Sequence, residues 1–325
     1  MIELKTKYLG LQLNNPLIVS SSGLTNTVEK IKRIEEYGGA AVVLKSLFEE
    51  QINAEADILL RYNEYPEASD YISGYSKNNS VSEYLKLIEN SKKEVKIPVF
   101  ASINCISTND WVTFAKQIES SGADAIELNI HIVPTDRTIV SSELEERYFE
   151  IVSTVSGLVN IPIAVKIGSY FSNLVHFTDQ LYANGAKGVV IFNRFYEPDI
   201  DIENLKMTSA DVFSSPTDIR HSLRWVGILA AKAKQIDISA STGVHDAEAV
   251  IKQLLAGADT VQICSVLYKK GIQHIKVILD ELQNWIYSKG FDSVEAMRGK
   301  MSYLSIKNPE VYERVQFMKY FSSIE

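Results

Sequence analysis

Cysteine is scarce in this chain of 325 residues, which has only Cys105 and Cys264. The two lie far apart, and neither belongs to a C-x-x-C pair. The sequence therefore predicts no disulfide framework, no cysteine-based metal site and no iron–sulfur centre. Two isolated thiols fit a reducing compartment, and we expect a cytoplasmic protein.

An excess of basic residues is also lacking, because 33 lysines and arginines face 41 aspartates and glutamates, for a formal net charge of −8. Nucleic acids and anionic membrane surfaces are bound through a basic footprint, so neither is expected as a partner. Long apolar runs are absent too, and the opening stretch MIELKTKYLGLQLNNP carries charges where a signal peptide or membrane anchor has an apolar segment. A small-molecule substrate is the expectation that remains.

What the chain does contain is a repeated junction of an amphipathic stretch, a glycine and a short apolar run. The four examples are EYGGAAVVLK ending at Lys45, SSGADAIELN ending at Asn129, ANGAKGVVIFN ending at Asn193 and LAGADTVQIC ending at Cys264. Glycine suits the left-handed position that closes a helix, and a short apolar run suits a strand buried on both faces. Four more strands are predicted at 16–21, 97–104, 161–167 and 236–241.

Eight predicted strands alternate with predicted helices at 27–37, 81–94, 109–121, 141–158, 173–184, 217–234 and 245–256. This alternation predicts an α/β protein with a single (β/α)8, or TIM, barrel over residues 1–325. A doubly wound open sheet is the alternative, but it usually has fewer strands and a glycine-rich first turn, and SSSGLTNT has no G-x-G-x-x-G.

Three segments fall outside the simple alternation. Residues 47–80 and 194–216 are too long for plain connections, and they predict functional βα loops after the second and sixth strands. The helical tail at 289–325 is expected to pack outside the barrel or against a neighbouring subunit.

Polar side chains stand where the predicted strands end. In such a barrel the strand C-termini meet on the catalytic face. One polar residue at a strand end can simply cap a loop, but the whole set suits a polar, electron-rich ring with a phosphate tail. The turns after the seventh and eighth predicted strands would bind the phosphate through backbone N–H groups. The set is Ser20, Ser21, Ser22, Lys45, Ser46, Asn104, Asn129, Lys166, Asn193, Ser241, Thr242, Gly243, Cys264 and Ser265.

Several motifs in this chain resemble, in order and spacing, the flavin mononucleotide (FMN) barrel of the dihydroorotate dehydrogenases. They are NPLIVSSSG, VVLKS, ELN, AVKI, FN and STGV, and the match runs from about residue 3 to residue 300. ELNIHIVPTD, IFNRFYEPDID, SSPTDIRHSLRW and LLAGADTVQ resemble the dihydroorotate dehydrogenase-like subgroup more closely. The resemblance implies an FMN-dependent oxidoreductase of a CH–CH bond, related to the oxidation of dihydroorotate to orotate in pyrimidine biosynthesis, and a possible homodimer.

The resemblance also implies roles for individual residues. Asn129 and Asn193 would contact the substrate, and the lysines would place positive charge where reduced flavin becomes anionic. The implied FMN contacts are Ser21, Ser22, Lys45, Ser46, Asn104, Asn129, Lys166 and Asn193, with Ser215, Thr242, Gly243, Cys264 and Ser265 on the phosphate side.

The substrate side departs from the family pattern, in which N-x-S-C-P-N or N-x-S-S-P-N supplies a Cys or Ser base. Ile132 stands at the base position and Pro134 at the final asparagine, and the N-S-x-G-x-x-N loop motif is not found. His131 is the candidate replacement base, because an imidazole with a reference pKa of about 6.5 can accept a proton at neutral pH. Two alternatives follow: an FMN oxidoreductase of another small carboxylate or pyrimidine-like substrate bound by Arg194, or a flavin-binding protein without turnover.

Overall fold

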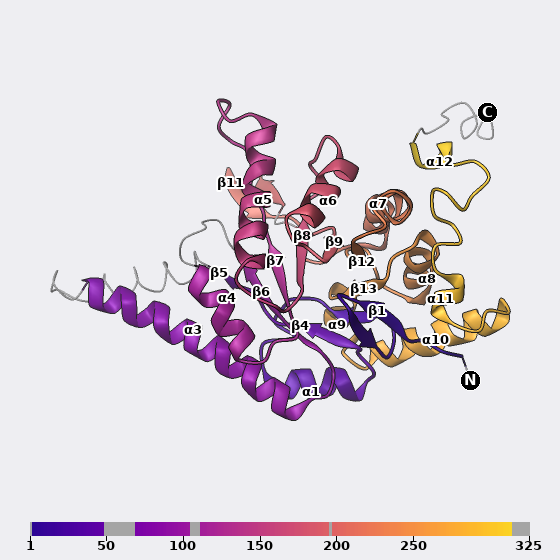
Figure 1. Ribbon diagram of the computed structural model, residues 1–325, viewed down its shortest axis with the longest axis horizontal. Coiled ribbons are helices and arrows are strands. Elements are labelled where there is room, and N and C mark those ends of the chain that lie inside the picture. The colour runs from indigo at the N-terminus through magenta and orange to yellow at the C-terminus, as the bar shows by residue number, and fades with distance from the viewer. Residues whose placement is uncertain (1, 49–68, 105–110, 195–196, 314–325) are drawn as a thin grey trace.

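A closed barrel of eight parallel strands forms the centre of the molecule (Figure 1). The computed structural model describes residues 2–48, 69–104, 111–194 and 197–313. Pairing of β4 with both β3 and β6 closes the barrel, and a short strand β5 (Leu47–Phe48) pairs beside β6. The predicted (β/α)8 barrel is confirmed. Its strands are β3 (Leu17–Val19), β4 (Ala41–Val43), β6 (Val99–Asn104), β7 (Ala125–Asn129), β8 (Ile163–Ile167), β9 (Gly188–Ile191), β12 (Asp237–Ala240) and β13 (Thr260–Ile263).

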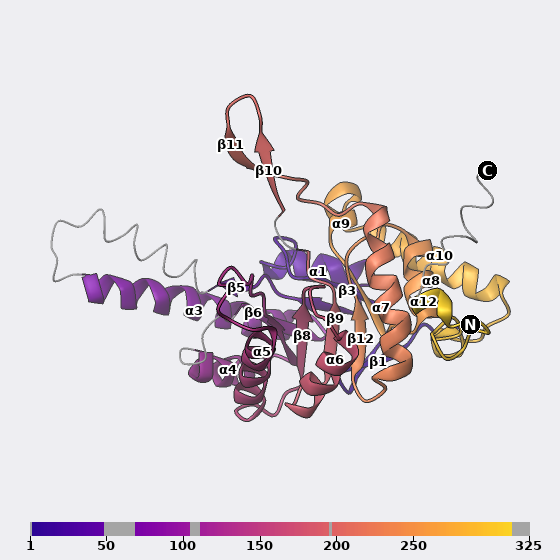
Figure 2. The same ribbon diagram turned by 90° about the horizontal axis from the view of Figure 1, so that it is seen from above.

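Helices surround the barrel and bury the outer faces of its strands (Figures 1 and 2). The glycines predicted to close helices do so in the left-handed region, with φ of +92° at Gly38, +89° at Gly122, +110° at Gly185 and +120° at Gly257. The helices are α1 (Val28–Glu36), α3 (Ser69–Glu94), α4 (Trp111–Ser120), α5 (Ser141–Ser156), α6 (Leu174–Ala183), α7 (Ile219–Lys232), α8 (Ala247–Ala256), α9 (Ser265–Lys270) and α10 (His274–Ser288).

The prediction was wrong about where α3 begins. We predicted this helix from residue 81, whereas it begins at Ser69 and its N-terminal part projects beyond the barrel (Figure 2). Residues 69–80, SDYISGYSKNNS, are rich in serine, asparagine and glycine, which have low helix propensity. The middle of the predicted loop, residues 49–68, lies outside the described residues.

The other long connection, after β9, contains an antiparallel hairpin of β10 (Pro198–Asp201) and β11 (Lys206–Ser209), which stands away from the barrel in Figure 2. It leads into a 3₁₀ turn, η2 (Pro216–Asp218), and then into α7. Beyond α10, α11 (Val294–Met297) contacts α8, and α12 (Glu310–Glu313) contacts α7. Within the described ranges, no helix combines the length and apolar character needed to cross a membrane.

The barrel interior is layered. An N-terminal hairpin of β1 (Thr6–Tyr8) and β2 (Leu11–Leu13), which we did not predict, places Tyr8, Leu9 and Leu13 in a core with inward-facing residues of the strands, including Phe100 and Ala164. Side chains alternate along a strand, so the residue two positions further on faces the same interior one layer nearer the strand C-termini. This next layer is polar and buried: it contains Ser20, Ser102, Glu127, Lys166 and Gln262.

Candidate functional site

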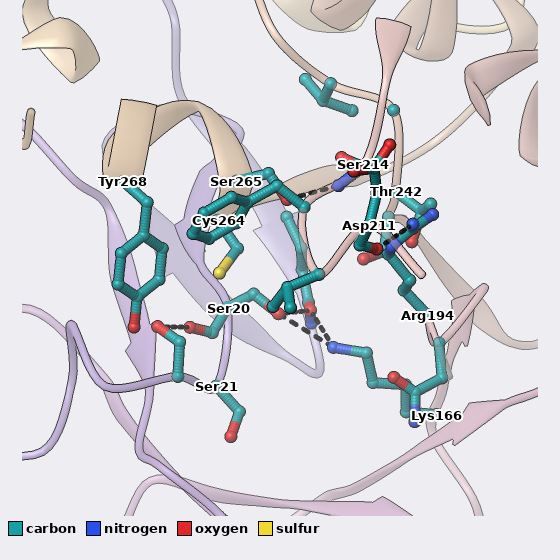
Figure 3. Close-up of a pocket in the computed structure, with 18 of the residues that line it drawn as sticks. Ser20, Ser21, Lys166, Arg194, Asp211, Ser214, Thr242, Cys264, Ser265 and Tyr268 are labelled. Atoms are coloured by element: carbon teal, nitrogen blue, oxygen red, sulfur yellow. Dashed lines mark hydrogen bonds between the residues drawn. The ribbon is translucent and has the colours of Figure 1, made fainter. Parts of the chain in front are cut away.

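A hydrogen-bonded network crosses the barrel beneath the strand C-termini. Lys166 Nζ donates to Ser20 Oγ at 2.9 Å (Figure 3). It also donates to Gln262 Oε1 at 2.9 Å and lies 3.4 Å from Glu127 Oε1. Gln262 Nε2 donates to Glu127 Oε2 at 2.5 Å. In the strand order, β3 faces β8 and β13 faces β7, so these contacts tie two pairs of opposite strands together.

Glu127 and Gln262 were not predicted. The Lys166 side chain is only 7% exposed, and a buried ammonium needs an anion beside it. Glu127, whose side chain is only 2% exposed, supplies that anion. Both residues lie inside apolar runs, AIELN and TVQIC. The available signal was spacing, since Glu127 precedes Asn129 by two residues and therefore faces the same side of its strand.

A second polar chain joins the ends of β3, β4 and β6. The Ser46 backbone N–H donates to Ser21 Oγ at 2.9 Å, and the Ser46 hydroxyl lies 3.0 Å from that of Ser21 and 2.7 Å from that of Ser102. Tyr84 donates its hydroxyl to the Ser102 carbonyl and accepts from the Ser102 N–H, and burial raises the pKa of Tyr84. These contacts fix Ser21 at the rim of the barrel.

A cavity of about 570 Å³ opens above the two networks. Asn193 lies in its wall and donates from Nδ2 to Asn129 Oδ1 at 2.6 Å. Eight of the predicted cofactor contacts line it: Ser21, Ser22, Lys166, Asn193, Thr242, Gly243, Cys264 and Ser265.

The other predicted cofactor contacts lie around this cavity without lining it. Lys45 is exposed beyond the end of β4, and Ser46 lies beneath Ser21. Asn104 ends β6, and its Oδ1 is buried with no hydrogen-bond partner among the described residues. Asn129 is bonded to Asn193, whereas Ser215 lines a neighbouring cavity.

The turn after β12 requires its glycine. Thr242 and Gly243 both have left-handed backbones, with φ of +74° and +78°, and Thr242 Oγ1 donates to the Phe192 carbonyl at 3.0 Å. A Cβ on Gly243 would lie 2.1 Å from the backbone nitrogen of Ile219, at the start of α7. Only glycine fits this approach, so the turn and α7 are held close together.

Ser214 is a site residue that the sequence analysis missed. Its N–H donates to Ser265 Oγ at 3.0 Å, its hydroxyl lies 3.0 Å from His245 Nε2, and its carbonyl accepts from Lys269 Nζ at 3.0 Å. Burial, and then the Lys269 ammonium, lower the pKa of His245, while burial raises the pKa of the Cys264 thiol. Ser214 thus joins the turns after β12 and β13, and Cys264 is a neutral thiol at pH 7.

A second cavity, of about 810 Å³, adjoins the first and shares Asn193, Arg194 and Thr242 with it. The predicted residues His131, Ile132 and Ser215 line this second cavity and not the first.

In the second cavity the segment that follows β7 presents one titratable side chain. His131 is partly buried, and burial lowers its pKa from the ordinary 6.5, so its imidazole is neutral at pH 7. Ile132 packs against the hydrophobic core, and its N–H donates to the Tyr148 hydroxyl at 3.4 Å. His131 is therefore the residue of this pair that can accept a proton.

Arg194 lies between the two cavities. Its Nη1 donates to Asp218 Oδ2 at 3.0 Å and its Nη2 to the Asp211 carbonyl at 2.7 Å (Figure 3 shows the second contact). Two of the guanidinium donors are thus used within the protein, and the arginine links the end of β9 to the segment that precedes α7.

Comparison with known proteins decides the family. Residues 3–286 match the family model for dihydroorotate dehydrogenase. The chain belongs to the dihydroorotate dehydrogenase family. The catalytic subunit of dihydroorotate dehydrogenase B (NAD(+)) of Thermoplasma volcanium is 25% identical over 92% of this chain and 98% of its own length. The probable dihydroorotate dehydrogenase A (fumarate) of Streptococcus pneumoniae is 26% identical over 94% and 100%.

A third relative, the putative dihydroorotate dehydrogenase A (fumarate) of Aeropyrum pernix, is 26% identical over 91% of this chain and 97% of its own length. The names of these relatives include both the NAD(+) and the fumarate type, at nearly equal identity. Similarity to this dihydroorotate dehydrogenase family therefore does not select an electron acceptor for the chain.

The residues of this family member fit an FMN molecule. The cavity of about 570 Å³ has the size of a cofactor site. The ammonium of Lys166 lies at one part of its wall, and the close-packed Thr242–Gly243 turn lies at another.

Proposed function

We propose that this chain is an FMN-dependent oxidoreductase that acts on a CH–CH bond of a small substrate. One observation carries the proposal: a buried lysine, balanced by Glu127, reaches the wall of a cavity whose other side is built from hydroxyls and a glycine turn. A fixed positive charge in a site shielded from water stabilises negative charge much more strongly than it would in water.

The cofactor contacts divide into two groups in this proposal. Ser21, Ser22, Lys166 and Asn193 would face the ring, where the lysine stabilises developing anionic charge. FMN, when bound, supplies a hydride acceptor. The phosphate would be held at the other side by Thr242, Gly243, Cys264 and Ser265, with Ser215 and the Ser214 contacts supporting the turns.

Proton transfer is assigned to His131. Its depressed pKa keeps the imidazole neutral and able to take a proton at pH 7, which Ile132 cannot do. Asn129 and Asn193, joined by their 2.6 Å hydrogen bond, would orient the substrate. His131 and Asn193 line the same cavity, so one bound molecule can reach both.

We propose a small carboxylate or pyrimidine-like compound other than dihydroorotate as the substrate. The support is the segment that follows β7, where Ile132 and Pro134 stand in place of a base and an asparagine of the family motif and line the second cavity. The same replacement favours a second candidate function, that of a flavin-binding protein without turnover.

The cofactor is tested by loading purified protein with FMN, desalting it and recording the flavin absorbance. We expect the flavin to remain with the protein in a 1:1 ratio, and a colourless protein would refute the cofactor assignment. The loaded protein is then mixed anaerobically with dihydroorotate, other cyclic and linear carboxylates, and reduced nicotinamides.

The substrate assignment predicts that dihydroorotate leaves the flavin oxidised while another compound of the set bleaches it. Bleaching by dihydroorotate would show that the family reaction is retained. Bleaching by none would favour the binding protein without turnover. We further propose a cytoplasmic homodimer, and light scattering on the eluted protein, which measures the mass of the particle, tests the dimer.

A further inference from the structure

A third cavity, of about 550 Å³, lies at the start of α7. Arg220, His221 and Arg224 line it from successive turns of the helix, together with the hydroxyls of Ser169 and Thr217. Arg220 and Arg224 are one helical turn apart, where two like charges repel each other unless an anion lies between them. The positive end of the α7 dipole adds to this field.

The charge in this cavity is not balanced by neighbouring acids. Asp218 is the only carboxylate among the described residues that line it, and Asp218 already accepts from Arg194, from the Ser215 N–H and from the Ser215 hydroxyl. Across the described ranges, neither Arg220 nor Arg224 forms an ion pair. A cavity with two unpaired guanidinium groups in a chain of net charge −8 favours an anionic ligand.

This cavity adjoins the proposed active site. It shares Ser169, Asp218 and His221 with the cavity of about 810 Å³ that contains His131. That cavity in turn shares Asn193 and Thr242 with the one proposed for FMN. A molecule bound at α7 therefore lies beside the cavity that contains the residues assigned to the reaction.

We propose that Arg220, His221 and Arg224 form an anion subsite, which binds a phosphate group carried by the substrate at a distance from the reacting bond. The proposal rests on the proposed oxidoreductase function and narrows its substrate to an extended molecule with an anionic arm. It also accounts for the loss of the family's compact substrate motif, because an extended substrate gains its binding energy outside the pocket around the ring. Carboxylate is the alternative oxyanion at the same subsite.

The test is calorimetric titration of the FMN-loaded protein at low ionic strength, with inorganic pyrophosphate in one arm and succinate in the other. The variant is Arg220→Gln/Arg224→Gln, in which both changes are at exposed helix positions. The matched control is Arg147→Gln, at an exposed position of α5. FMN loading closes the phosphate turns to added anions, and far-UV circular dichroism confirms that each variant is folded.

We expect pyrophosphate to bind the wild type and the control equally, with a 1:1 ratio. The double variant should bind it roughly ten- to a hundredfold more weakly, since two exposed and solvent-screened charge contacts are lost. If succinate binds and loses affinity in the double variant while pyrophosphate does not bind, the group bound at the subsite is a carboxylate and not a phosphate. Equal affinity in the double variant, or no heat from either anion up to about 10 mM, would overturn the subsite.

The flavin absorbance of the same samples separates this result from the parent proposal. If FMN is retained and the arginine changes have no effect, only the anion subsite fails. If FMN is not retained, the oxidoreductase proposal fails, and the difference in anion affinity between wild type and double variant still decides the subsite.

Discussion

The buried pair of Glu127 and Lys166 makes the sharpest test of how the barrel holds its site. We consider three variants, Glu127→Gln, Lys166→Met and the two changes combined. Each single change leaves one charge in a layer where Glu127 is 2% and Lys166 is 7% exposed. Removing one partner of a buried ion pair costs about 3–5 kcal/mol, because the remaining charge has lost its compensation.

The magnitude of the coupling follows from the geometry. At 3.4 Å, and with an effective dielectric constant of about 20, the attraction between the two charges is about 5 kcal/mol. Gln262 stays hydrogen-bonded to whichever charge remains, and Ser20 stays bonded to Lys166 where the lysine is kept, so part of the loss is offset. We therefore expect each single variant to lose about 3–5 kcal/mol of unfolding free energy, and the double variant to lose about 2–4 kcal/mol less than the sum of the two.

The assay is urea denaturation followed by tryptophan fluorescence and circular dichroism, on protein without FMN so that ligand binding does not add to stability. The control is the same cycle on Lys276 and Asp280, which are 3.0 Å apart but 66% and 56% exposed. An exposed pair one turn apart on a helix couples by about 0.3–0.5 kcal/mol. The comparison isolates burial, because both pairs join a lysine to a carboxylate at similar distance.

Additive effects, or single variants that lose less than about 1 kcal/mol, would refute the reasoning, since they would show that solvent reaches the pair as it does at the surface. Such a result would also remove the argument that Lys166 is a fixed positive charge in the proposed flavin site.

Three further predictions concern the site. Gly243→Ala should weaken FMN binding at least tenfold, because the new Cβ would meet the Ile219 nitrogen. It should also lower the free energy of unfolding by more than the roughly 1 kcal/mol cost of a left-handed alanine. Fluorescence titration and denaturation measure the two effects, and unchanged affinity would contradict the turn assignment. His131→Asn should slow flavin reduction about 10²–10⁴-fold. Because the imidazole pKa is lowered, the wild-type rate should stay level above pH 6.5 and fall only at lower pH. A rate that falls as the pH rises above neutrality would exclude the histidine as base. Arg194→Ala should retain FMN and lose ligand affinity, which calorimetry would detect; unchanged affinity would limit Arg194 to its contact with Asp218.

Much of the fold could be predicted because short-range patterns in the sequence indicate where each helix ends and the next strand begins. Each helix-closing glycine is followed by a short apolar run, and the glycines at 38, 122, 185 and 257 all have the left-handed backbone that this pattern requires. The N-terminal hairpin was not predicted, because it has no packing of its own and is held by contacts inside the barrel, such as those of Tyr8 and Leu9. The start of α3 was missed for the related reason that residues 69–80 have low helix propensity.

The site was predictable only in part, and the missing residues share a physical cause. Strand ends are visible in the sequence, so Lys166, Asn193 and Thr242 could be singled out. Glu127 and Gln262 are hydrogen-bonded only because their strands face each other across a closed barrel. No short-range sequence pattern indicates a contact between two residues so far apart in the chain. The same holds for the contacts of Ser214 with three residues from later segments of the chain, since its own neighbourhood, VFSSP, shows only a turn.

The proposed cofactor half and the proposed substrate half of the site differ in where they are built. Lys166 and Gln262 lie on barrel strands, and they are bonded across the interior, so a substitution there disturbs several strands at once. Ile132 and Arg194 lie beyond strand ends, where a new side chain changes a cavity wall without altering strand pairing. A substitution in the proposed substrate half should therefore disturb the barrel less than one in the proposed cofactor half. Substrate identity in this chain should accordingly be sought in the loops and at α7, not in the barrel strands.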